Sequence, residues 1–200
     1  MHLQRLSRLS DLIFAGAMTI MALTFEPLPL QEMTSSEVTE LLQRQLPSFG
    51  IYALTFIGIA FYWISQIHQF QYYKKTDTVH LWLILLSLMF VAILPYANDL
   101  SALYDGILSI QVFYSLSVAG IGIFSAAAWI YATHNRRLVA QNISEQTIRK
   151  IRQENYIEPI IALLSIVGAL IHPLGWVLTF LVGFPLIFMI QMLFQVKEKS

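Results

Sequence analysis

The 200-residue chain contains no cysteine, and only 12% of its residues are charged. The absence of cysteine excludes disulfides, thiolate metal sites and cysteine nucleophiles. A soluble domain of this size carries roughly twice this fraction of charged residues. Hydrophobic residues make up 56% of the chain, and the mean hydropathy is +0.62. This composition predicts an integral membrane protein with several spans.

Six apolar stretches approach the length of about 20 helical residues that crosses the hydrocarbon core. They cover residues 11–24, 49–68, 80–96, 108–133, 157–171 and 174–194. The fifth stretch is short, and His172-Pro173 suits a tight turn into the sixth, so a re-entrant hairpin is the alternative there. The sequence predicts an all-α membrane protein whose single domain, residues 1–200, contains six transmembrane helices.

Basic residues are distributed unevenly between the two sides that six spans define. The terminal side receives eleven of the twelve Lys and Arg residues: Arg5, Arg8, Lys74, Lys75, Arg136, Arg137, Arg149, Lys150, Arg152, Lys197 and Lys199. The opposite side receives Arg44 and several acids. Because basic loops stay in the cytoplasm, both termini are predicted to be cytoplasmic, in a multi-pass protein of the cell (plasma or inner) membrane.

Two polar segments are predicted to form helices outside the spans. The segment between Pro29 and Pro47 has Ser35 or Ser36 as candidate caps. In the segment from Leu138 to Tyr156, Asn142 and Glu145 have the spacing of a capping box.

The first span carries Asp11 at its inner boundary, three residues after Arg8. These two residues lie on neighbouring helical faces, so they form either a partly buried ion pair or an ordinary membrane-interface anchor. A stripe of small, hydroxyl-bearing and branched residues follows: Gly16, Thr19, Ile20 and Leu23, with Glu26 at its outer end. Such a stripe is typical of close helix packing; as a pore wall it would gate by dewetting.

The segment Arg5-Leu6-Ser7-Arg8-Leu9-Ser10-Asp11 resembles the Arg-x-x-x-Phe-Ser-Asp motif of the transmembrane protein 175 family of potassium channels. Four further segments are similar to the corresponding family segments. They are the run from Asp11 to Leu23 that follows the motif, the pair Tyr62-Trp63, the loop residues Lys75-Thr76-Asp77 and the run from Leu81 to Tyr96. Three residues depart from the family pattern: Leu9 replaces phenylalanine, Gln66 replaces histidine and Ile84 replaces asparagine.

The resemblance implies a potassium-preferring cation channel, not an enzyme, that assembles as a homotetramer around the first helix of each subunit. Such a channel has no filter of backbone carbonyls, and we expect no cofactor and no metal site. The expected partners are other copies of the chain, membrane lipid and permeant monovalent cations, with potassium as the main permeant ion and without nucleic acid. By position, Gly16, Ile20 and Leu23 would form the constriction, and Thr19 would present hydroxyls to the ion. Gly16 stands where the family has a branched apolar residue.

The resemblance also implies that Arg5, Ser10 and Asp11 tie the pore helix to its neighbours, while Glu26 lies at the outer mouth. Two other classes of function stay open from the residues alone. One is a proton-coupled secondary transporter that uses Asp11, and the other is a non-conducting membrane scaffold. The chain shows no nucleophile–base constellation, which argues against an enzyme.

Overall fold

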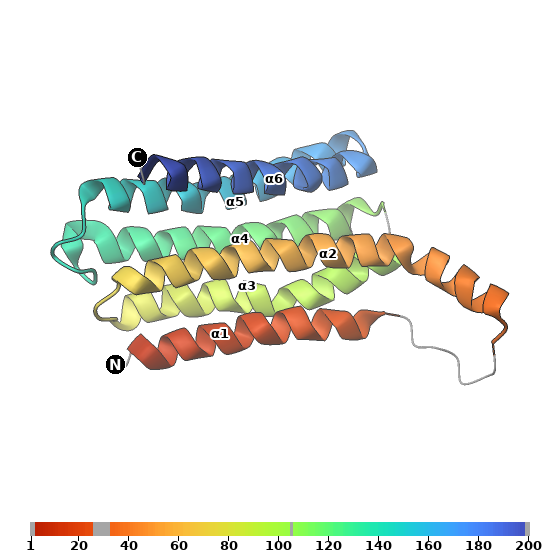
Figure 1. Ribbon diagram of the computed structural model, residues 1–200, viewed down its shortest axis with the longest axis horizontal. Helices are drawn as coiled ribbons and strands as arrows, with labels where there is room; N and C mark the ends of the chain where they lie inside the picture. The colour runs from red at the N-terminus through yellow and green to blue at the C-terminus, as the bar shows by residue number, and fades with distance from the viewer. Residues whose placement is uncertain (1–2, 26–32, 105, 199–200) are drawn as a thin grey trace.

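The computed structural model describes residues 3–25, 33–104 and 106–198; for residues 24, 184 and 187–198 it describes the backbone alone. Six long helices make up nearly all of this part of the chain, with two short 3₁₀ segments (Figure 1). Their bounds are α1 Leu3–Ile20, η1 Met21–Thr24, α2 Ser35–Tyr72, α3 Thr78–Leu103, α4 Leu108–Thr133, η2 His134–Arg136, α5 Glu145–Ile171 and α6 Pro173–Glu198.

Five of these helices are long and apolar enough to cross a membrane, namely α1 to α5. The fifth is a 27-residue helix, so it qualifies as a full span and not as one arm of a re-entrant hairpin. In α6 the apolar stretch with described side chains is Pro173–Gly183, although the helix itself continues to Glu198. The prediction of an all-helical membrane protein is confirmed.

The polar segments expected as separate helices are instead the first turns of α2 and α5. Helix α2 has 38 residues and passes through Pro47, and α5 passes through Pro159. A proline inside a membrane helix is tolerated because neighbouring helices support the local backbone. The segment between the proline and the N-cap therefore continues the helix beyond the apolar span.

Side chains at the helix starts explain where these helices begin. Thr34 forms a capping box with Glu37 at the start of α2, and the Ser144 hydroxyl accepts a hydrogen bond from the Thr147 N–H at the start of α5. The predicted caps Ser35, Ser36 and Asn142 are wrong by one or two residues. Each real cap supplies the oxygen that satisfies an otherwise unpaired N–H of the first turn.

Helix α4 lies in the middle of the bundle, between α3 and α5, while α1 lies at one edge beside α3 and α2 (Figure 1). Helices α5 and α6 lie at the opposite edge. Helix α1 begins and α6 ends at the same end of the bundle, which is also where the α2–α3 and α4–α5 connections lie. These connections hold Lys74, Lys75, Arg136 and Arg137, and Arg5 and Arg8 lie in the first turns of α1, so this end of the molecule is rich in basic residues.

Polar side chains are paired with one another inside the bundle. The Thr55 hydroxyl on α2 lies 2.9 Å from Asn98 Oδ1 on α3 and 2.7 Å from the Tyr114 hydroxyl on α4. Ser115 on α4 lies 2.6 Å from Ser165 on α5. These bonds join buried side chains across helix interfaces, so they fix the mutual positions of α2 to α5.

Candidate functional site

Helix α1 has one face that packs against the bundle. Leu6, Ser10, Phe14 and Ala17 are buried there, and Met21 continues the row in η1. They recur at intervals of three or four residues, as expected for one face of an α-helix. This face contacts mainly α3 and α2, which fixes the direction of every other side chain on α1.

The opposite face of α1 is uncovered in the protomer. Leu12 is 71% exposed, Ile20 54% and Leu23 80%. Thr19 is also exposed, and its hydroxyl donates to the Ala15 carbonyl at 2.8 Å. The residues that share this face are Leu9, Leu12, Gly16, Thr19, Ile20 and Leu23, which we call the α1 stripe. The predicted constriction residues therefore lie together on the face that the protomer leaves open.

Gly16 marks an open position within the α1 stripe. A Cβ atom added there would have no non-local atom within 4 Å. The glycine is therefore not required for helix packing inside the protomer, and a larger side chain would fit. In any assembly whose copies turn this face inward, Gly16 leaves a wider section between Leu12 and Ile20.

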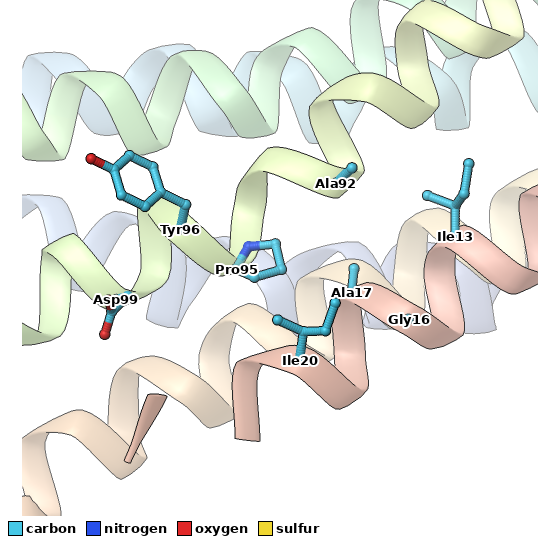
Figure 2. A pocket seen from close by; sticks show the side chains of 8 residues that line it. All are labelled: Ile13, Gly16, Ala17, Ile20, Ala92, Pro95, Tyr96 and Asp99. Atoms are coloured by element: carbon cyan, nitrogen blue, oxygen red, sulfur yellow. The ribbon is translucent and has the colours of Figure 1, made fainter. Parts of the chain in front are cut away.

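A groove of about 470 Å³ runs between the α1 stripe and α3. Figure 2 shows its walls, with Ile13, Gly16, Ala17 and Ile20 on α1 facing Ala92, Pro95, Tyr96 and Asp99 on α3. Pro95 has no N–H and its ring perturbs the helix, which accounts for the irregular wall of α3 at this point. Most of the lining is apolar, and Asp99 carries the negative charge.

The three residues predicted to anchor α1 have different surroundings. Asp11 Oδ1 accepts a hydrogen bond from the Trp63 indole N–H on α2 at 3.0 Å. Ser10 is buried, and its hydroxyl donates to the Leu6 carbonyl within α1. Arg5 is exposed. Of these residues, Asp11 is the one that joins α1 to another helix through a hydrogen bond.

The ion pair between Arg8 and Asp11, one of the two alternatives, does not form. Among the described residues, ion pairs join Arg136 to Glu145 and Arg137 to Asp77. From the sequence, Trp63 was used only for the family resemblance, and its role as the donor to Asp11 was missed. A buried or interfacial indole N–H usually has a hydrogen-bond acceptor, so the sequence did indicate that Trp63 needs an acceptor.

The sequence also missed the α3 wall of the groove and the buried residue Glu158 on α5. Asp99 was assigned only to an outer acidic region, and Glu158 lies inside the predicted fifth span. Glu26, the predicted acid of the outer mouth, lies outside the described residues. Within the described parts of the chain, no group of three or more His, Asp or Glu side chains could hold a metal ion.

Asp77 organises the connection between α2 and α3, at the basic end of the bundle. Its carboxylate caps α3 by accepting from the His80 N–H at 3.0 Å, and it accepts from the Tyr131 hydroxyl at 2.8 Å. Partial burial acts to raise the pKa of Asp77, but these hydrogen bonds and the Arg137 guanidinium lower it below its ordinary value. The carboxylate thus fastens α3 to α4.

Comparisons with known proteins identify this arrangement. Residues 5–95 match the family model described as "Endosomal/lysosomal potassium channel TMEM175". A potassium channel of Streptomyces collinus is 26% identical over 152 residues, which cover 74% of this chain and 73% of that protein. The chicken endosomal/lysosomal proton channel TMEM175 is 26% identical over 141 residues. The latter match covers 70% of this chain but 28% of the chicken protein.

Two solved structures share the fold. The TMEM175 homologue of Chamaesiphon minutus, described as a lysosomal potassium-selective channel, superposes with a TM-score of 0.76 at 19% identity. That alignment covers 94% of this chain and 96% of the other. A variant of the potassium channel MtTMEM175, in complex with a Nanobody-MBP fusion protein, gives a TM-score of 0.61 at 18% identity, covering 98% and 94%.

A bundle of six long helices, five of which are long and apolar enough to cross a membrane, defines a multi-pass helical membrane protein. The family match spans α1, α2 and most of α3, and it therefore includes the α1 stripe, Trp63 and Pro95. Over residues 5–95 the chain is similar to the TMEM175 family. This is a family of channels, not of enzymes, whose members are embedded in membranes.

Proposed function

We propose that the protein is a potassium-preferring cation channel, a homotetramer in which the α1 stripe of each copy faces a central conduction path. The observation that carries the proposal is the uncovered stripe itself. It combines apolar side chains at Ile20 and Leu23 with a hydroxyl at Thr19, on the one α1 face that the protomer does not bury. The family and the Streptomyces relative are both named as potassium channels, which supports potassium as the permeant ion.

The chemistry of the stripe suits a narrow, weakly interacting path. In a tetramer, the four Ile20 and four Leu23 side chains would surround the conduction path and exclude water from part of it, which would set the barrier to ions. Rings of Thr19 would offer oxygens that replace part of the hydration shell of a cation. Asp11 faces Trp63 on α2, so its role in this proposal is to hold α1 in place, away from the ion.

The decisive experiment measures potassium and sodium flux through the purified protein in liposomes, with and without a proton gradient. We expect passive flux that prefers potassium and needs no proton gradient. Saturating flux that requires protons would indicate a transporter, and absence of flux under both conditions would indicate a scaffold. The mass of the purified particle tests the tetramer, since four copies are expected.

Matched substitutions test which residues line the path. Ile20 and Leu164 are both 54% exposed in the protomer, but Leu164 lies on α5 at the other edge of the bundle. Ile20→Ala should raise flux several-fold by widening the apolar section, and Leu164→Ala should leave flux unchanged. Gly16→Leu should lower flux, because the added side chain enters open space on the stripe. Equal flux in all of these variants would contradict the proposed pore wall.

A further inference from the structure

Glu158 is a carboxyl group buried inside the bundle, on the side away from α1. Its side chain belongs to α5 and the residue is 5% exposed. Among the described residues, no hydrogen bond or ion pair involves this carboxyl. A buried carboxylate without a cation or a hydrogen-bond donor is strongly disfavoured. The ionised form of Glu158 would therefore need a cation or a donor beside it, and the carboxyl has neither as a partner.

Helices α4 and α6 pack closely against α5 next to Glu158. A Cβ atom added to Gly122 on α4 would lie 2.6 Å from the ring of Pro159, the next residue after Glu158. A Cβ atom added to Gly183 on α6 would lie 2.5 Å from Ile161. Little space therefore remains around α5 at this level, where Glu158 is 5% exposed.

The groups that face Glu158 do not supply a positive charge. Tyr62 on α2 is its titratable neighbour across the interface, and the Tyr62 hydroxyl donates to the Val118 carbonyl on α4 at 2.9 Å. Within α5, Glu154 lies one turn earlier and adds a like charge. Arg152 is six residues earlier, about 240° around the helix from Glu158. Near Pro159, α4 presents Gly122 and Ser125, and the Pro173–Gly183 part of α6 contains no charged residue.

Two side-chain atoms on α2 and α5 are buried without a partner, the acceptor Gln66 Oε1 and the donor Asn155 Nδ2. The backbone carbonyl of Asn155 loses its usual helical donor, because Pro159 has no N–H. A protonated carboxyl has one O–H to donate, whereas a carboxylate has none.

We infer that Glu158 is a proton-binding site in the interior of the bundle, occupied at neutral pH and separate from the α1 stripe. The bound proton allows α5 to pack against α4 and α2 without a buried charge. Release of the proton requires α5 to move so that water or a cation reaches the carboxylate. The inference does not depend on conduction along α1, since α3 and α4 lie between α1 and α5 (Figure 1).

Infrared spectroscopy of the full-length protein in detergent tests the inference directly. A neutral carboxylic acid has a carbonyl stretch that carboxylates and amides lack. We expect this band at neutral pH in the wild-type protein, its loss in Glu158→Gln, and its retention in Glu154→Gln, the same change one turn away. Absence of the band from the wild-type protein, or its persistence in Glu158→Gln, would overturn the inference.

Thermal unfolding provides the second readout, because glutamine is a neutral isostere of the protonated side chain. Glu158→Gln should unfold at the wild-type temperature at neutral pH. At strongly alkaline pH the wild-type protein should unfold at a lower temperature than Glu158→Gln, as its carboxyl ionises. Failure of Glu158→Gln to fold, or parallel curves for the two proteins at every pH, would also overturn the inference.

Discussion

Helices α1 and α4 have similar hydropathy but opposite surroundings. The most apolar windows of the two spans have mean hydropathies of 1.4 and 1.6, yet 28% of the α1 window is buried against 67% of the α4 window. Helix α4 is the centre of the protomer, and its small residues allow close neighbours. Helix α1 buries one narrow face and leaves the α1 stripe open. Hydropathy thus identifies both as membrane helices, but packing separates the helix that the protomer encloses from the one that it leaves open on one face.

The first test of this contrast makes the same change at two glycines. Gly122→Ala places a Cβ 2.6 Å from Pro159, so it should lower the free energy of unfolding by about 1–3 kcal/mol through overpacking. Gly16→Ala should raise that free energy by up to about 1 kcal/mol, because alanine favours helix and the space is open. Denaturation in mixed micelles measures both. Equal effects at the two positions would mean that α4 is not packed more closely than α1.

The second test compares two threonines. Thr55→Val removes the hydroxyl that contacts Asn98 and Tyr114, and we expect a loss of about 1–3 kcal/mol because buried polar groups are left unpaired. Thr19→Val on the α1 stripe should leave the free energy of unfolding unchanged and reduce the preference for potassium over sodium in liposome flux. A stability loss at Thr19 with unaltered ion preference would remove it from the conduction path.

The third test concerns the link between α1 and α2. A double-mutant cycle with Trp63→Phe and Asp11→Ala should give a coupling energy of about 0.5–1.5 kcal/mol, the value of one hydrogen bond. Trp82→Phe is the control, since Trp82 is 59% exposed on α3. Asp11→Ala should impair assembly more than ion preference. If Asp11→Ala changes ion preference alone, then Asp11 faces the ion instead of Trp63.

The smallest effect is expected at the basic end of the bundle. The pKa of Asp77 is lowered in the folded state, so its contribution to stability is present above the unfolded-state pKa of about 3.9 and is lost as the pH falls through the folded-state value. Because the side chain is 37% exposed, Asp77→Asn should cost only about 0.5 kcal/mol at neutral pH. The difference between the two proteins should vanish in acid; a constant difference would exclude titration of Asp77 as the cause.

Some of the fold is predictable from hydropathy because apolar residues mark the hydrocarbon region directly. The fourth span, predicted at 108–133, matches α4 at both ends. The starts of α2 and α5 were not predictable in the same way, since a polar helix can continue an apolar one through a proline. Pro47 was therefore misleading as a boundary.

The candidate site was only partly visible in the sequence. The spacing of Gly16, Ile20 and Leu23 places them on one helical face, and the structure leaves that face uncovered. The partner of Asp11 was not predictable, because 52 residues separate it from Trp63. Glu158 was hidden for a different reason: at the edge of an apolar run it resembles a boundary residue, and its burial depends on α2 and α4.

The length of α2 has a consequence for whatever approaches the protein from outside the membrane. Its 38 residues span about 57 Å at 1.5 Å per residue, whereas the hydrocarbon core is about 30 Å thick. The stretch before Pro47 projects beyond the other helices (Figure 1). A soluble molecule that reaches this surface would therefore touch the exposed carboxylates of Glu37 and Glu40 before it touches any lipid-embedded residue.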